Sequence, residues 1–203
     1  TKIRIMRASF TGELGYEIYI APKYGLELWK KIFSCGKVFN LIPYGTETMH
    51  LLRAEKGYIV VGQETDGTVT PIDLNYNWMI GKNKMDFIGK RSLSRPDTKR
   101  NDRKQLVGLS PVNKSDKIEE GQHIVEIDRL PKKIINPIKY LGHVSSSYHS
   151  PNLNQSIGLA MIKGGNNLIG QKFFVTVSGK TQNIPVEVVN PVFIDPENKR
   201  LTS

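Results

Sequence analysis

The sequence predicts an α+β protein: a mixed α/β region of helices and strands, followed by a small antiparallel β-barrel or jelly-roll-like domain. In residues 1–95 helical and strand patterns alternate, whereas from residue 105 onward short strand patterns are separated by glycine, proline and polar turns. A basic stretch lies between these regions, so we predict domains at 1–95 and 105–203 joined by a linker at 96–104. The chain has 203 residues, 38% of them hydrophobic, which suits one or two domains with a real core.

The first region opens with two strand patterns and a helix pattern. Residues 3–9 and 16–20 alternate apolar and polar side chains around a turn, and we expect the second strand to be half-buried. Residues 24–35 carry one apolar stripe at helical spacing, which predicts an amphipathic helix that ends at Gly36.

A second helix is expected at 45–56. Thr46 is placed to cap its first turn, and Gly57 is the expected left-handed terminator. Further along, Thr70 followed by Pro71 predicts another helix start, because proline is favoured at the first helical position.

The second region is predicted to be entirely β. Its strand patterns are regularly spaced, as in a small antiparallel barrel or sandwich, and the stretches 113–120 and 128–137 are predicted loops. The predicted strands are 105–110, 121–127, 140–149, 157–162, 171–178 and 184–190.

Composition narrows the possible partners. The net charge is +10, but the lysines are spread along the chain without interleaved stacking aromatics, which argues against nucleic-acid binding. The densest basic stretch, 95–104, reads as a solvated linker or, alternatively, as a rim that attracts an anionic ligand or a protein partner. No apolar run is long enough to span a membrane. The single cysteine, Cys35, excludes an internal disulfide and fits a reducing, cytoplasmic location.

Several chemical motifs are missing. The four histidines show no metal-ligand spacing, and one cysteine cannot form a multi-thiolate site, so no metal site is predicted. The serine-hydrolase elbow, the phosphate-binding loop and the glycine-rich dinucleotide fingerprint are also missing. We therefore predict no nicotinamide or flavin dinucleotide site in these residues.

The segment 10–17, Phe-Thr-Gly-Glu-Leu-Gly-Tyr-Glu, is the strongest candidate for a binding site. Its two glycines allow a tight turn that brings backbone close to a flat group. Glu17 then follows on a strand with apolar alternate neighbours, where a carboxylate needs water or a hydrogen-bonding partner. It can accept two parallel N–H bonds from a planar donor, either an arginine or an amino-pyrimidinone ring. A solvated or arginine-paired carboxylate is the alternative.

A second candidate cluster lies at the end of the predicted helix 45–56. Arg53 and Glu55 are two residues apart, so they point in different directions on a helix. From the residues alone, each could pair with its own neighbour.

Several motifs, in this order and spacing, resemble the glycine-cleavage T-protein (aminomethyltransferase) family over nearly the whole chain. They are Thr-Gly-Glu-Leu-Gly-Tyr-Glu at 11–17, Leu-Arg-x-Glu-x-Gly at 52–57, Asp-Phe-Ile-Gly-Lys at 86–90, Gly-His-Val-Ser-Ser at 142–146 and Pro-Val-Phe-x-Asp-Pro at 191–196. The resemblance implies a partial folate-binding domain at 1–95 followed by the family's C-terminal barrel.

The resemblance implies roles for five residues. Glu17 matches the glutamate that hydrogen-bonds the pterin ring of folate, and Phe10 matches an aromatic position that packs on that ring. Tyr16 belongs to the same motif. Arg53 and Glu55 match the arginine and glutamate of the Leu-Arg-x-Glu segment, which we interpret as supporting the site.

Some features place the chain within the family. Lys56 resembles the sarcosine oxidase and dimethylglycine dehydrogenase branch, because aminomethyltransferases usually have alanine there, and Met49 stands where they often carry an arginine. The family's aspartate near the folate N10 lies in an N-terminal half with no counterpart here. Since Thr1 already precedes a strand pattern, we expect a fragment of a longer enzyme that is inactive alone and holds no catalytic acid or base.

The implied function is the one-carbon-transfer part of a sarcosine oxidase alpha subunit. In that reading tetrahydrofolate captures the imine or formaldehyde unit from oxidative demethylation of sarcosine as 5,10-methylenetetrahydrofolate. FAD, FMN or NAD would belong to missing segments or partner subunits, and the partners would be the other sarcosine oxidase subunits. The alternatives are a glycine-cleavage-type aminomethyltransferase, a related folate-dependent demethylase, or a non-enzymatic folate-binding factor for iron–sulfur maintenance.

Overall fold

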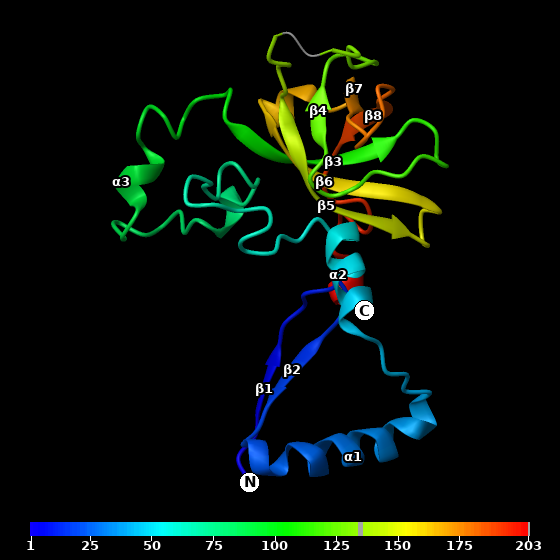
Figure 1. The fold of residues 1–203 in the computed structure, drawn as a ribbon. Helices are drawn as coiled ribbons and strands as arrows, with labels where there is room; N and C mark the ends of the chain where they lie inside the picture. Colours follow the sequence, from blue (N-terminus) through cyan, green and yellow to red (C-terminus); the bar gives the residue numbers. More distant parts are fainter. Residues whose placement is uncertain (134–135, 203) are drawn as a thin grey trace.

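The computed structural model describes residues 1–133 and 136–202 and shows a β-barrel connected through one helix to a small outlying lobe (Figure 1). The helix is α2 (Thr46–Glu55), which runs from the lobe to the barrel. The lobe contains a two-stranded ribbon and helix α1 (Gly25–Gly36). This arrangement confirms the predicted α+β class.

The barrel is closed and antiparallel, with the strand order β3-β6-β5-β4-β7-β8. Each of its strands falls on a segment that the sequence predicted, although β4 and β7 are shorter than expected. The strands are β3 (Lys104–Pro111), β4 (His123–Val125), β5 (Gly142–Ser150), β6 (Gln155–Lys163), β7 (Lys172–Val175) and β8 (Ile184–Val189). The predicted loop 113–120 contains no helix or strand, and residues 134 and 135 of the predicted loop 128–137 lie outside the described residues.

The main core lies inside the barrel, where fully buried side chains come from four different strands: Val107, Leu109, Val144, Ile162 and Val188. A second, smaller apolar cluster includes Ala54 of α2, Leu74, and Leu106 and Leu159 of the barrel strands. Fully burying a side chain of this size contributes about 1.5–3 kcal/mol. The barrel therefore holds most of the apolar stabilisation of this chain.

The ribbon is formed by β1 (Arg4–Arg7) and β2 (Tyr16–Tyr19), which pair antiparallel with Arg4 opposite Tyr19 and Arg7 opposite Tyr16. The expectation of a half-buried second strand is wrong, because every residue of both strands is exposed. Alternation predicted the strand, but neither face of the ribbon is buried by the elements that the structure describes.

The helix ends differ from the prediction in two places. Gly36 lies inside α1, which continues as a 3₁₀ turn at Lys37–Phe39 and stops at Asn40, a residue in the left-handed conformation with φ of 55°. Thr46 does not cap α2: the N-cap is Gly45, with no side-chain cap hydrogen bond. Gly57 is confirmed as a left-handed residue with φ of 72°, and a Cβ there would lie 2.6 Å from the Pro191 carbonyl oxygen.

The helix predicted after Thr70 is absent from this stretch of the described chain. The Asp73 carboxylate does accept the Thr70 N–H at 2.8 Å, as a capping residue would, but the chain turns instead of continuing. Asn75 adopts a left-handed φ of 63°, which ends the turn. The remaining short helices are α3 (Lys90–Leu93) and 3₁₀ turns at Pro22–Tyr24, Asn77–Met79, Gly165–Leu168 and Lys199–Leu201.

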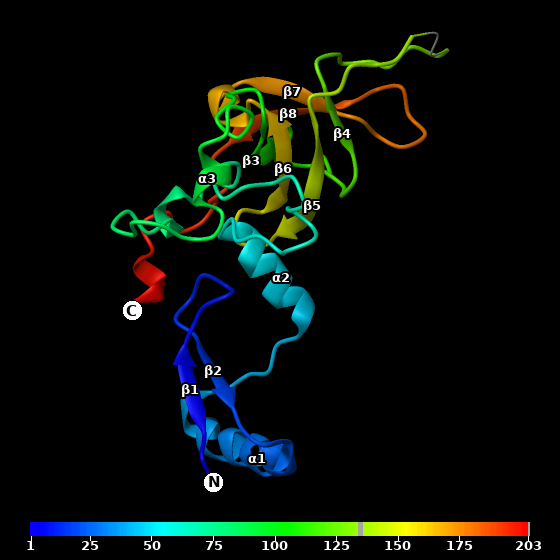
Figure 2. The ribbon, with the colours of Figure 1, turned by 90° about the vertical axis from the view of Figure 1, so that its left-hand side faces the viewer.

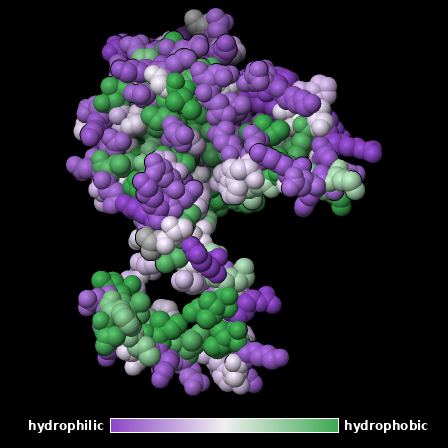
Figure 3. All heavy atoms as spheres, turned by 180° about the vertical axis from the view of Figure 1, so that it is seen from behind, coloured by the Kyte–Doolittle hydropathy of each residue, from purple (hydrophilic) through white to green (hydrophobic). Residues whose placement is uncertain are grey.

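The outlying lobe exposes many apolar side chains. Hydrophobic residues gather on the lobe in the view of Figure 3, and the exposed ones include Ile5 at 62%, Leu26 at 66% and Trp29 at 57%. In the part of the chain that the structure describes, no helix combines the length and apolarity needed to cross a membrane.

We expect Leu109→Ala to lower the free energy of unfolding by about 2–5 kcal/mol, because it removes a fully buried side chain from the barrel core. Leu26→Ala on α1 is the matched control and should change it by less than about 0.5 kcal/mol. Chemical denaturation of both variants checks this, and equal losses would contradict the placement of the core in the barrel.

Candidate binding site

The turn between β1 and β2 is built from residues 8–15 and rests on the end of helix α2 (Figure 2). It is closed by the hydrogen bond from the Ala8 N–H to the Gly15 carbonyl at 3.2 Å. Gly12 is buried at its apex with φ of 82°, and its N–H donates to Ser9 Oγ at 3.0 Å. A Cβ at Gly12 would lie 2.6 Å from the Lys56 side chain, so only glycine lets the turn sit this close to α2.

Glu17 follows this turn on β2, and its side chain is exposed. Its carboxylate accepts a hydrogen bond from the Tyr19 hydroxyl. That bond, followed by the negative charge of Glu17, raises the pKa of Tyr19. No arginine or lysine among the described residues forms an ion pair with Glu17, so the arginine-paired alternative is not what the structure shows.

The two faces of the ribbon carry different side chains. Glu17 lies opposite Met6 and shares its face with Tyr19, since alternate residues of a strand point the same way. Tyr16 is therefore on the other face, together with Ile18, and is 61% exposed. The structure does not bring Tyr16 and Glu17 together on one surface, and a ligand contact by Tyr16 stays a prediction.

Phe10 is half-buried in the turn and contacts helix α2. Its ring approaches that of His50 edge to face, with centroids 6.2 Å apart and an interplanar angle of 83°. His50 Nδ1 is buried and has no hydrogen-bond partner among the described residues. A buried unpaired ring nitrogen is costly, so this atom beside Phe10 is a notable feature of the site. No sequence pattern predicted a role for His50.

Arg53 is completely buried where α2 meets the barrel. Its guanidinium lies 3.1 Å from Glu64 Oε2 and 2.8 Å from Ser146 Oγ, and it also donates to the Tyr58 carbonyl at 3.1 Å. The Tyr148 ring is 5.8 Å from the guanidinium carbon. Both charges of this pair are withdrawn from water, and further hydrogen bonds to the two terminal guanidinium nitrogens compensate for that burial. Arg53 Nε has no hydrogen-bond partner among the described residues.

Glu64 receives the rest of that network. Its carboxylate accepts the Val60 N–H at 2.7 Å and the Ser145 hydroxyl at 3.1 Å, and it also accepts from the Ser146 hydroxyl. A register shift in β5 between Val144 and Ser146 places three consecutive residues in buried positions. Two serines thereby face the same carboxylate.

Glu55 attaches the same helix to a different part of the barrel. Its carboxylate accepts from Ser150 Oγ at 2.5 Å and from Asn152 Nδ2 at 2.9 Å, and its backbone carbonyl accepts the N–H groups of Phe193 and Ile194. Arg53 and Glu55 therefore do not converge. Both hold α2 from the barrel side, and their direct contact with a ligand stays a prediction.

Sequence reasoning missed Glu64, Ser146 and Asn152 as members of this network. Glu64 lies in a Gly-Gln-Glu segment, and Ser146 lies in the Gly-His-Val-Ser-Ser segment of the family resemblance. Neither periodicity nor spacing could show that a bulge in β5 turns Ser145 and Ser146 toward a glutamate about 80 residues upstream.

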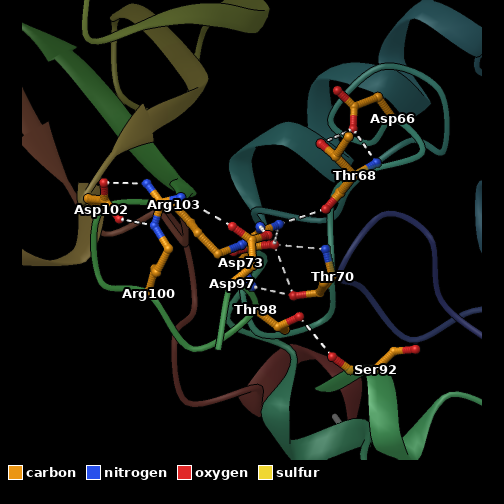
Figure 4. Close-up of polar contacts among 10 residues, drawn as sticks. All are labelled: Asp66, Thr68, Thr70, Asp73, Ser92, Asp97, Thr98, Arg100, Asp102 and Arg103. Atoms are coloured by element: carbon orange, nitrogen blue, oxygen red, sulfur yellow. Dashed lines mark hydrogen bonds and ion pairs between the residues drawn. The ribbon is translucent and has the colours of Figure 1, made fainter. Parts of the chain in front are cut away.

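Most residues of the basic stretch 95–104 are exposed, and two of its arginines pair with carboxylates (Figure 4). Arg103 forms a two-pronged ion pair with Asp73, at 2.9 and 2.8 Å, and a third contact with Asp97 at 2.9 Å. Its side chain is only 16% exposed. Arg100 pairs in the same way with Asp102 nearby. Local carboxylates therefore neutralise much of this stretch, and Arg103 fixes it to the 66–73 loop.

Comparison with known proteins identifies the class of protein. The family model described as the GCVT N-terminal domain matches residues 1–84, and the model described as the glycine cleavage T-protein C-terminal barrel domain matches residues 104–195. The chain belongs to the glycine cleavage T-protein family. The predicted domain boundaries at residues 95 and 105 stay a prediction.

Particular relatives are similar over nearly all of this chain. The sarcosine oxidase subunit alpha of Corynebacterium sp. (strain U-96) is 48% identical over 97% of the chain, and that of Rhizobium meliloti (strain 1021) is 36% identical over 97%. The aminomethyltransferase of Clostridium botulinum (strain Kyoto / Type A2) is 34% identical over 88%. The chain spans only 20% of each oxidase subunit and 45% of that aminomethyltransferase.

A solved structure shares the fold. The crystal structure of glycine cleavage system aminomethyltransferase T from Bartonella henselae matches with a TM-score of 0.78 at 24% identity. The match covers 95% of this chain and 50% of that one.

We expect Arg53→Met to lower the free energy of unfolding by about 3–5 kcal/mol, because it leaves the Glu64 carboxylate buried without its cation. Arg100→Met removes an exposed pair and should cost less than about 1 kcal/mol. Denaturant titration of both variants, with Arg53→Met/Glu64→Gln as a partial rescue, checks this. A loss for Arg53→Met no larger than that of its control would contradict the role of the pair.

A second expectation concerns acid stability. Burial, and then the charges of Lys104 and His123, lower the pKa of His143 from its ordinary value of 6.5. A depressed folded-state pKa contributes stability that is present above pH 6.5 and is lost as the pH falls. His143→Gln should therefore flatten the fall in unfolding free energy between about pH 7.5 and 5.5, as measured by denaturation. His149→Gln on the same strand is the exposed control, and an unchanged slope for His143→Gln would contradict the assignment.

Proposed function

We propose that this chain is the tetrahydrofolate-binding part of a one-carbon-transfer enzyme. The observation that carries the proposal is the Glu17 carboxylate, which follows a tight glycine turn on β2 and has no cationic partner among the described residues. Among the described residues, the Glu17 oxygens accept a side-chain hydrogen bond only from the Tyr19 hydroxyl.

The residues of the turn fit a pterin ring. A carboxylate binds the paired N–H groups along one edge of an amino-pyrimidinone with two parallel hydrogen bonds, and a phenyl ring packs on the face of a flat heterocycle. Phe10 in the turn and Glu17 on the strand that follows it would supply these two groups. The unpaired, buried Nδ1 of His50 beside Phe10 is a further polar atom that a ligand group would satisfy. Tyr16, Arg53 and Glu55 complete the proposed set, the last two as supports of the helix.

The tasks of these residues are binding and orientation. Tetrahydrofolate, when bound, supplies the nitrogen that takes up the one-carbon unit. Glu17 fixes the in-plane orientation of the ring, and Phe10 fixes its height above α2. We assign no acid or base to residues 1–203, and we propose that a proton-transfer group lies elsewhere in the intact enzyme.

We further propose that this chain is part of a sarcosine oxidase alpha subunit. FAD, FMN or NAD would be bound by other segments or by partner subunits. This assignment is supported by the 48% identity to the Corynebacterium subunit, against 34% to the Clostridium aminomethyltransferase. The names of the first relatives describe them as subunits, which supports a hetero-oligomer. Incubating the intact enzyme with tetrahydrofolate and sarcosine distinguishes the two: methylene-tetrahydrofolate formation coupled to sarcosine oxidation supports the oxidase, and a requirement for an aminomethylated carrier protein supports the transferase.

We expect Glu17→Ala to weaken tetrahydrofolate binding by about tenfold or more, because hydrogen bonds to a charged group contribute about 1.5–3 kcal/mol. Glu126→Ala, an exposed carboxylate at the end of β4, is the matched control and should bind like the parent protein. Anaerobic calorimetry with the full-length protein measures both dissociation constants. Equal affinity of the two variants would overturn the proposed pterin contact.

A further inference from the structure

Lys56 is a buried cation for which the proposed function provides no task. It follows directly after α2, and its side chain is only 4% exposed. The amine donates to the backbone carbonyl of Asp195 and lies 3.1 Å from the Asp195 carboxylate. A buried ammonium is costly unless it is paired and hydrogen-bonded, so this contact is required for Lys56 to occupy its position.

Asp195 uses the rest of its carboxylate to fold the end of the chain. Oδ1 accepts the Lys199 N–H at 2.9 Å and Oδ2 accepts the Arg200 N–H at 3.1 Å, which closes the turn before the 3₁₀ segment Lys199–Leu201. Asp195 adopts a left-handed φ of 51°, an uncommon conformation for a non-glycine residue. The surrounding contacts hold it there.

The segment 195–202 in turn contacts the ribbon at two points. Arg200 forms an ion pair with Glu13 in the turn at 2.9 Å, and the Leu201 carbonyl accepts from the Arg7 guanidinium at 2.7 Å. Figures 1 and 2 both show the C-terminal end of the chain close to the turn between β1 and β2. Each of these exposed contacts is weak by itself, so their effect depends on a segment 195–202 that is already folded.

Lys56 touches both partners with one side chain. Its methylene stem packs under Gly12 at the apex of the turn, where a Cβ would be 2.6 Å from Lys56 Cγ, while its amine holds Asp195. The apex of the ribbon turn and the start of segment 195–202 are thus both held by Lys56 at the end of α2. Every residue of β1 and β2 is exposed in the described structure, so the turn depends on these contacts for its position.

We infer that Lys56 and Asp195 form a clasp that positions the turn 8–15, which carries Phe10 and leads into β2 with Glu17. Both are positioning residues: they lie behind the turn and act on a ligand only through it. The consequence for folate rests on the proposed function, whereas the consequence for the turn itself does not.

The test compares Lys56→Met, which keeps most of the stem and removes the charge, with Asp195→Asn, which keeps the shape of the carboxylate. Lys139→Met is the exposed control. Peptide-resolved hydrogen exchange in the full-length protein should show exchange in 8–15 and 195–202 faster by about tenfold in both variants, with β6 unchanged. Lys56→Arg, which restores the charge, should recover part of the protection.

Tetrahydrofolate affinity should fall by about threefold or more in both variants, because the turn is no longer held in place before binding. The double variant should bind little worse than either single variant, because each substitution already breaks the same contact. Unchanged exchange in 8–15, or equal acceleration in β6, would overturn the clasp. If exchange changes as expected but Glu17→Ala binds folate normally, the clasp stands and the proposed function fails. If exchange changes and Glu17→Ala loses affinity while both clasp variants bind normally, the positioning role fails.

Discussion

The ion pair between Arg53 and Glu64 fixes how the ribbon lobe is connected to the barrel. Helix α2 carries the lobe, yet its sequence is largely polar, and Ala54 is its only fully buried apolar residue among those described. Apolar packing alone would hold such a helix weakly and in several orientations. A guanidinium whose donors meet a carboxylate, a carbonyl and the Ser146 hydroxyl permits one geometry, because any rotation of the helix would leave a buried charge without partners.

The position of the lobe depends on contacts made by three residues at the C-terminal end of α2. Successive residues of a helix point about 100° apart, so Arg53, Glu55 and Lys56 reach three different neighbours. Arg53 contacts the bulged part of β5, Glu55 contacts the Ser150–Asn152 loop and the backbone of Phe193, and Lys56 contacts Asp195. The ribbon has almost no apolar packing of its own. Its turn is therefore placed by polar contacts that begin in the barrel and pass through the helix end and segment 195–202.

The parts of this fold that sequence could predict are those decided by local pattern. The barrel strands, helices α1 and α2 and the left-handed Gly57 depend on alternation, on helical spacing and on a glycine at a helix end. The failures have tertiary causes. The pattern at 16–20 indicates a strand but cannot say whether anything covers it, and the Thr70–Asp73 arrangement resembles a helix start until Asn75 ends it with φ of 63°.

The candidate site divides in the same way. Phe10 lies in the turn and Glu17 on the strand after it, so both come from one hairpin of consecutive residues. Arg53 and Ser146 are 93 residues apart and meet only because β5 carries a bulge, and Lys56 and Asp195 are 139 residues apart. No local pattern contains such pairings.

The exposure of Glu17 determines what it can contribute to binding. In water a carboxylate exchanges hydrogen bonds to solvent for hydrogen bonds to a ligand, so its net contribution is modest and its main effect is on orientation. Orientation is useful only if the carboxylate itself is held in place. The Tyr19 hydroxyl restrains the Glu17 side chain, and the turn beside it is fixed to α2 through Gly12. The structure therefore places its rigidity behind the exposed carboxylate, which is what the proposed alignment of a flat ring by Glu17 requires.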